Sequence, residues 1–158
     1  MGGTALTVLS PRTAAQVEPV VVEEMIAEGL IGNAPDPFGW YSTESLPYGY
    51  SLDAPDSETG WAELRILDRA SGVVMRCAIG LHIFISDLAG RPALGRMAER
   101  VALRTEGWVF VEFHALPSAG LLGHLEKAGR CIRIEDCVHL DAPAMAAWNA
   151  HPHFHVVK

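Results

Sequence analysis

The hydrophobic pattern is strongest between Val73 and His114, where it predicts a strand, a helix and a second strand. Residues 73–85 are rich in β-branched side chains and apolar at nearly every position, which is typical of a strand covered on both faces. Residues 92–104 are apolar at helical spacing, and residues 107–113 form another run that is apolar on both faces. If the two strands are neighbours, the helix makes a right-handed crossover between parallel strands.

The pattern before this unit is weaker. Residues 4–9 alternate and predict a short strand, and Ser10-Pro11 is typical of a helix start because the Ser hydroxyl can cap free amides. Pro19 lies inside the predicted helix and should kink or divide it. Residues 61–67 fit a helix and a strand equally well, so both alternatives stay open.

The remaining pattern predicts short elements. Residues 118–128 predict a helix, and residues 130–135 alternate cleanly, as a strand near a sheet edge does. Asp141 caps a final helix, and residues 154–157 predict a last short strand. Together these elements predict one α+β domain over residues 1–158, with a mixed, partly parallel sheet of five or six strands covered by three or four helices.

Residues 33–60 show no clear period and are predicted to form a long loop. They contain four prolines and five aromatic residues beside several carboxylates. Long loops in compact domains are commonly functional, and rigid rings beside charges suit a protein-binding surface. The alternative is that the rings fold back onto the core. The candidate partner-binding residues are Asp36, Trp40, Tyr41, Glu44, Tyr48, Tyr50, Asp53, Asp56 and Glu58.

The net charge of −7 comes from the first part of the chain. Between Thr13 and Leu64 the sequence has ten Asp or Glu residues and no Lys or Arg, whereas residues 65–158 carry nine acids and eleven bases. Such a field steers a protein partner with a basic surface and disfavours nucleic acid and anionic membranes. The alternative is that the acids only keep the domain soluble.

A second charge pattern lies in the predicted helix of residues 92–104. Arg96, Arg100 and Arg104 follow one another at intervals of four, so they share one side of that helix. We expect this side to face solvent, with Glu99 as a local partner.

Three observations bear on the compartment. Residues 1–11 carry no positive charge, which predicts no secretory signal. No apolar stretch reaches the ~18 residues that cross a bilayer. The three cysteines form no C-x-x-C pair, which favours a reducing cytoplasm.

The sequence predicts no catalytic residue and no cofactor, since it has neither a G-x-S-x-G turn nor a phosphate-binding glycine loop. Glu112 and His114, which follow a predicted central strand, are the best-placed acid–base pair. A metal-binding protein or small enzyme is the alternative to a binding module. His151, His153 and His155 would carry it, because a period of two places them on one side of a strand and His is a common zinc ligand.

Two segments resemble a known kind of protein. Residues 145–158, which read MAAWNAHPHFHVVK, together with residues 92–102 and 106–109, resemble a family of small bacterial proteins. That family is similar to the immunity partners of polymorphic toxin systems. The resemblance implies a cytoplasmic, non-catalytic inhibitor that occludes a basic toxin domain such as a nuclease, and it implies no catalytic residue.

Overall fold

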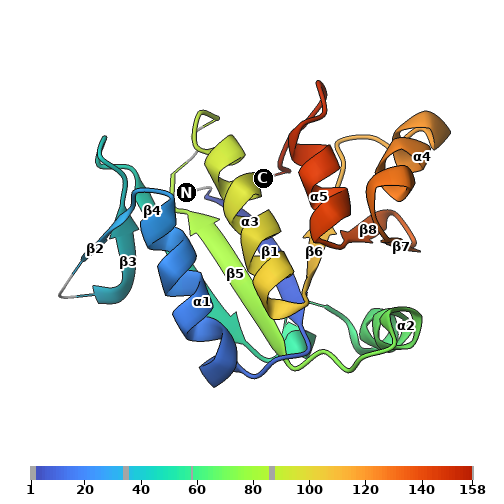
Figure 1. Ribbon diagram of the computed structural model, residues 1–158, viewed down its shortest axis with the longest axis horizontal. Helices are drawn as coiled ribbons and strands as arrows, with labels where there is room; N and C mark the ends of the chain where they lie inside the picture. The colour runs from blue at the N-terminus through green and yellow to red at the C-terminus, as the bar shows by residue number, and fades with distance from the viewer. Residues whose placement is uncertain (1–2, 34–35, 58, 86–87, 158) are drawn as a thin grey trace.

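The computed structural model describes residues 3–33, 36–57, 59–85 and 88–157 (Figure 1). Within these ranges the chain forms eight strands, five α-helices and one turn of 3-10 helix, η1. The strands are β1 (Thr4–Ser10), β2 (Ile31–Asn33), β3 (Asp36–Tyr41), β4 (Pro47–Asp53), β5 (Cys77–Ile83), β6 (Trp108–Val111), β7 (Cys131–Ile134) and β8 (Cys137–Leu140). The helices are α1 (Ala14–Ala27), η1 (Pro55–Ser57), α2 (Trp61–Ser71), α3 (Arg91–Thr105), α4 (Ala119–Ala128) and α5 (Ala142–Asn149).

The strands form one sheet in the order β2-β3-β4-β5-β1-β6-β8-β7, and every neighbouring pair is antiparallel. The first strand, β1, lies between β5 and β6 and pairs with both. As a result β5 and β6 run in the same direction without touching, and α3 crosses from one to the other over β1. In the same way β5 separates the two strands β1 and β4.

This topology corrects the predicted sheet. The prediction of a mixed, partly parallel sheet of five or six strands with three or four helices is wrong, because the described chain has eight antiparallel strands and five helices. The strand–helix–strand unit itself is present as β5, α3 and β6. The hydrophobic pattern could not show that β1, which is distant in sequence, pairs between its two strands.

The main core lies on one face of the sheet. Helices α1, α3 and α5 lie across this face in Figure 1, and α4 adds the buried Leu125 to the same cluster. From the sheet, Val8, Ile79 and Val109 face these helices and are fully buried. The helix α2 instead belongs to a smaller cluster on the other face, where Leu67 packs near Leu9 and Trp108.

The segment 33–60 is not one long loop. It holds the strands β3 and β4 and the turn η1, joined by short connections. Two prolines fit this arrangement because Pro47 is the first residue of β4 and Pro37 lies in β3 outside its ladder with β4. Proline content therefore marked strand ends here rather than a loop.

Four local predictions have clear outcomes. Ser10 does not start a helix: it is the last residue of β1, and its hydroxyl donates to the carbonyl of Thr105 at 2.8 Å. Helix α1 starts at Ala14 and continues through Pro19 without division. Residues 61–67 lie in a helix. Residues 154–157 form no strand, and they pack against the core through the buried Val156.

Two other predictions are confirmed. Ser118 caps α4 by accepting the Leu121 N–H at 3.1 Å, and β7 is an edge strand of the sheet. None of the helices in the described part of the chain combines the length and apolar character needed to cross a membrane.

Candidate functional site on the open face of the sheet

Within the described residues, a helix covers the face of the sheet opposite α1, α3 and α5 at one end. There α2 packs Leu64 and Leu67 against residues of β1, β6 and β7. Farther from α2, this face carries exposed residues on β1, β3 and β4 and at Phe84, which directly follows β5. We call this surface the open face. It consists of the strand residues Ala5, Thr7, Tyr41, Gly49, Ser51, Asp53, Gly80, His82 and Phe110, together with Phe84 and Glu112, which directly follow β5 and β6.

The strand register places small residues at the centre of the open face. Ser51, Gly80, Thr7 and Phe110 stand opposite one another on four successive strands. Paired residues of an antiparallel sheet point to the same side, so these four share one face. Of these four residues only Phe110 has a large side chain. The surface at the centre of the open face therefore lies close to the backbone of the sheet.

A polar pair sits at this centre. The Ser51 Oγ lies 3.1 Å from the His82 Nε2, and the His82 ring stacks on Phe84 with ring centroids 5.7 Å apart. Gly80 makes the pair possible, because a Cβ there would lie 2.6 Å from the His82 Nε2 and would also overlap the Ser51 Oγ. The pair has the spacing of a nucleophile and a base, and it adds a polar group to the centre of the open face.

Aromatic rings flank this centre. Tyr41 is 42% exposed and Phe84 is 52% exposed. Partly exposed aromatic rings offer a partner apolar contact area, and they lose little side-chain conformational entropy on binding. This combination is suited to contact with a macromolecule.

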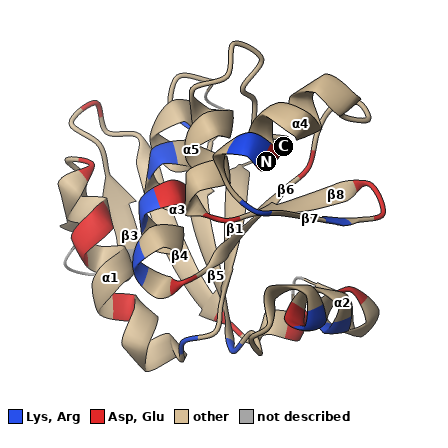
Figure 2. Cartoon of the chain, turned by 45° about the vertical axis from the view of Figure 1, so that its right-hand side comes forward, with Lys and Arg blue, Asp and Glu red and all other residues tan. Residues whose placement is uncertain are grey.

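The open face also carries acidic charge. No Lys or Arg occupies an open-face position in the described strands, whereas Asp53 is exposed in β4 and Glu112 is exposed directly after β6. Burial raises the pKa of the nearby Cys137, and the carboxylates of Glu112 and Glu63 raise it further. In Figure 2 the central strands are largely tan, and most coloured segments lie on helices and turns. Asp53 is the last residue of β4 and Glu112 directly follows β6, so these two acids lie at strand ends of the open face.

A cavity of about 370 Å³ lies where β1 and β6 separate. Their ladder ends at the pair Thr7 and Phe110, although β1 continues to Thr4 and β6 to Val111. The cavity is lined by Gly3, Ala5, Leu6, Thr7, Phe110, Val111, Glu112, His155, Val156 and Val157. Its volume lies at the lower end of the range of roughly 300–1,000 Å³ that is common for small-molecule sites.

A buried histidine continues the central row. His139 stands opposite Phe110 and Ile132 and is fully buried, with its ring centroid 5.4 Å from that of Phe110. Neither ring nitrogen has a hydrogen-bond partner in the described part of the chain. Burial lowers the pKa of His139 to about 4, so the ring is neutral near pH 7.

The predicted partner-binding residues divide into two groups. Trp40, Tyr48 and Tyr50 lie in the main core, which is the alternative that the sequence left open. The Tyr50 hydroxyl donates to Glu18 at 2.9 Å, and burial together with this carboxylate raises the pKa of Tyr50 to about 12.

The other predicted residues are at the surface or outside the described structure. Tyr41, Glu44, Asp53 and Asp56 are exposed, and Tyr41 and Asp53 belong to the open face. The side chain of Asp36 and the residue Glu58 lie outside the described part of the structure. The strand register therefore brings only part of the predicted set together.

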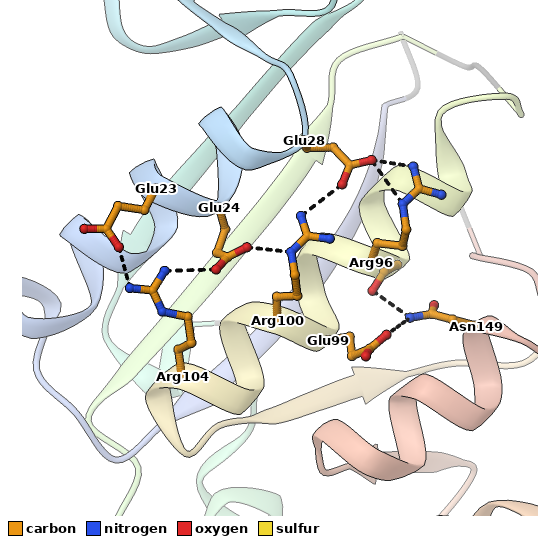
Figure 3. Close-up of polar contacts among 9 residues, drawn as sticks. Glu23, Glu24, Glu28, Arg96, Glu99, Arg100, Arg104 and Asn149 are labelled. Carbon is orange, nitrogen blue, oxygen red and sulfur yellow. Dashed lines mark hydrogen bonds and ion pairs between the residues drawn. The ribbon is translucent and has the colours of Figure 1, made fainter.

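Three acids of the first third are neutralised within the fold. Figure 3 shows Glu23, Glu24 and Glu28 of α1 facing Arg96, Arg100 and Arg104 of α3. Arg100 binds Glu24 at 2.5 Å and Glu28 at 2.9 Å. The expectation that Glu99 is the partner of these arginines is wrong, because Glu99 accepts from the Asn149 amide at 3.0 Å. The side chains of Arg96 and Arg104 remain 52% and 38% exposed, although they pair with α1. We call these six residues the Arg–Glu ladder.

His151, His153 and His155 do not form the predicted strand face, because residues 151–157 form no strand. The His155 Nε2 accepts the His114 N–H at 3.1 Å, and its ring stacks on that of His114. His151 lies nearer to His124, with ring centroids 5.6 Å apart. Within the described residues, no three His, Cys, Asp or Glu side chains are grouped in a way that could hold a metal ion.

Several open-face residues were missed by sequence reasoning, namely Ala5, Thr7, Gly49, Ser51, Gly80, His82, Phe84 and Phe110. One usable signal was present, because a glycine inside a strand often marks a close approach of neighbouring atoms, as Gly80 does. The others depend on which strands pair, and the local sequence does not show this.

Comparison with models of protein families, with curated proteins and with solved structures finds no match to this chain.

Proposed function

We propose that this chain is a non-catalytic protein-binding module whose open face occludes a partner with a basic surface. The resemblance of its tail and of α3 to immunity partners of polymorphic toxin systems favours a toxin domain, such as a nuclease, as that partner. The observation that carries the proposal is the open face itself: an incompletely covered sheet with exposed rings, bordering carboxylates and no basic residue at its described strand positions.

The Arg–Glu ladder reduces the number of carboxylates that can attract a basic partner, because three of the acids are already paired with arginines. Glu24 and Glu28 are largely buried and paired, so they contribute little field outside the molecule. Asp53, Asp56 and Glu112 are exposed and have no ion pair within the described residues. These three are the proposed steering charges, with Tyr41 and Phe84 as the proposed contact rings.

A reducing cytoplasm is the proposed compartment. Cys77, Cys131 and Cys137 are free thiols. Burial raises the pKa of Cys131 to about 11, with a further contribution from the carboxylate of Glu126. A thiol that stays protonated near pH 7 is a poor nucleophile, which is consistent with structural cysteines in a reducing environment.

The test has two stages. The partner is first captured from the native host with the tagged chain and purified, and its association rate is then measured by surface plasmon resonance. Asp53→Lys and Glu112→Lys are each expected to lower the association rate about tenfold at low salt, and the effect should shrink as salt rises from about 0.05 to 0.5 M.

The matched control is Glu126→Lys on α4, which makes the same charge change in an exposed residue of the helical layer. Its association rate should stay close to that of the unmodified chain. If all three variants slow association equally, net charge alone would explain the effect and the open face would have no special role.

A further inference from the structure

The gap between β1 and β6 exposes main-chain groups inside the sheet. The β1–β5 ladder continues through Leu6, Ala5 and Thr4, whereas the β1–β6 ladder stops at Thr7. Among the described residues, the first three residues of β1 are therefore paired with a neighbouring strand on one side only. An unpaired strand side is a template for a further strand.

The register identifies the groups that face the gap. The Phe84 N–H donates to the Pro47 carbonyl at 3.0 Å, so the even-numbered residues of β5 bond to β4 and the odd-numbered ones bond to β1. On β1 the partners of these odd residues include Thr4 and Leu6. Ala5 lies between them, so its N–H and C=O groups point toward β6. The β1–β6 pairing, which ends at Thr7, does not include Ala5.

The cavity beside Ala5 has an apolar floor and an acidic rim. Leu6, Val111 and Val156 are buried and belong to the main core. Ala5 and Glu112 are exposed and lie on the open face. A strand placed along β1 would point the residue opposite Ala5 toward the open face, near Glu112, and its two neighbours toward the floor.

We propose that this gap binds an extended segment of the basic partner, in which a Lys or Arg is flanked by two aliphatic residues. The main chain of the segment pairs with Ala5, its aliphatic side chains enter the cavity of about 370 Å³, and its cation reaches Glu112. This mode of recognition is β-strand addition, in which backbone hydrogen bonds give affinity and alternate side chains give specificity. The proposal deepens the proposed function and rests on it for the identity of the partner.

The test uses synthetic peptides and the full chain. A fluorescein-labelled peptide, acetyl-Val-Lys-Val-Lys-Val-amide, is titrated with the protein and binding is followed by fluorescence anisotropy. The same peptide with Glu in place of Lys is expected to bind at least about tenfold more weakly. A peptide N-methylated at both lysines should also lose about tenfold, since the lysine opposite Ala5 then lacks its main-chain donor.

Two variants of the protein locate the site. Glu112→Lys should weaken binding of the Lys peptide about tenfold, whereas Glu126→Lys should leave it unchanged. Ala5→Pro deletes the one β1 donor that faces the gap and spares the ladder with β5, so it should weaken binding to a similar extent. If Ala5→Pro disturbs folding, as judged by circular dichroism, the N-methylated peptide makes the same comparison without changing the protein.

The inference is overturned if the Lys peptide does not bind, or if N-methylation, Ala5→Pro and Glu112→Lys all leave its affinity unchanged. These results are distinguishable from failure of the proposed function. If the captured partner still depends on Asp53 while the gap variants have no effect, the open face binds the partner and the gap does not.

Discussion

His139 gives a prediction whose size follows from the structure. The ring is fully buried and both nitrogens lack a protein partner in the described chain, so burial opposes its protonation. Its pKa is about 4 in the folded chain, against 6.5 for an ordinary histidine. At about 1.4 kcal/mol per pKa unit, the folded state loses about 2 kcal/mol relative to the unfolded state near pH 5, and about 3 kcal/mol once the pH is below about 4.

The sign follows from proton uptake. Because the folded-state pKa is depressed, the unfolded chain binds the proton first as the pH falls below 6.5. The stability present at neutral pH is therefore lost between pH 6.5 and about 4. His139→Leu removes this contribution, and it also removes two unsatisfied polar atoms whose burial costs about 1–3 kcal/mol.

The assay is urea unfolding of both proteins at about pH 7.5 and near pH 5. At the higher pH, His139→Leu should be as stable as the unmodified chain or more stable. Between the two pH values, it should lose about 2 kcal/mol less than the unmodified chain loses.

The control is Ile132→Val, which changes the residue opposite His139 without altering a titratable group. It should cost about 0.5–1.5 kcal/mol at both pH values. The reasoning about His139 is refuted if His139→Leu retains the full pH dependence, or if it destabilises the neutral protein by more than about 2 kcal/mol, because the second result would mean that the ring nitrogens have partners.

Two further predictions concern the Arg–Glu ladder and the centre of the open face. Burial would raise the pKa of Glu24, but the hydrogen bonds from Arg100 and Arg104 outweigh it and hold that pKa below the usual 4.5. Glu24→Gln should therefore lower the free energy of unfolding by about 1–2 kcal/mol near neutral pH, and the difference from the unmodified chain should disappear as the pH falls below 4.5. Arg12→Gln, which breaks a more exposed pair of 3.7 Å with Glu106, should change stability by less than about 0.5 kcal/mol, and an equal effect in both variants would count against the ladder. Gly80→Ala should cost about 1–3 kcal/mol in thermal or urea unfolding because its Cβ overlaps Ser51 and His82, and adding Ser51→Ala should recover part of that loss; no recovery would show that the strain lies elsewhere.

The sequence pattern predicted correctly those features that depend on residues close together in the chain. The apolar spacing of residues 92–104 predicted α3, and Ser118 predicted the start of α4, because helical period and capping depend on neighbours in sequence. Proline content misled the interpretation of residues 33–60, where Pro47 begins a strand. Without knowledge of pairing, a strand-start proline and a loop proline look alike.

The order of the strands in the sheet could not be predicted from the local hydrophobic pattern. The insertion of β1 between β5 and β6 is set by pairing between residues about 70 to 100 positions apart, as in Leu6 with Leu81 and Leu9 with Trp108. The Arg–Glu ladder could not be predicted for the same reason, since its paired residues are far apart in the sequence. Arg100 and Glu24 are 76 positions apart, so the pattern of the helix over residues 92–104 alone predicted only that Arg100 faces solvent.

The candidate site likewise contains some residues that the sequence predicted and others that depend on contacts between distant parts of the chain. Composition predicted an acidic surface with exposed rings, and Tyr41 and Asp53 lie on the open face. Charge counts along the chain could not show that Glu23, Glu24 and Glu28 are neutralised by α3. Nor could they show that Glu112, from the balanced part of the chain, joins Asp53 on the same face.

Carboxylate footprinting of the complex tests the central claim most directly. The chain, alone and with its captured partner, is modified with a carbodiimide and glycine ethyl ester, and the labelled residues are identified by mass spectrometry. Binding through the open face predicts that Asp53 and Glu112 become protected while Glu126 stays as reactive as in the free chain. Protection of Glu126 with Asp53 and Glu112 unchanged would place the partner on the helical layer and contradict the account.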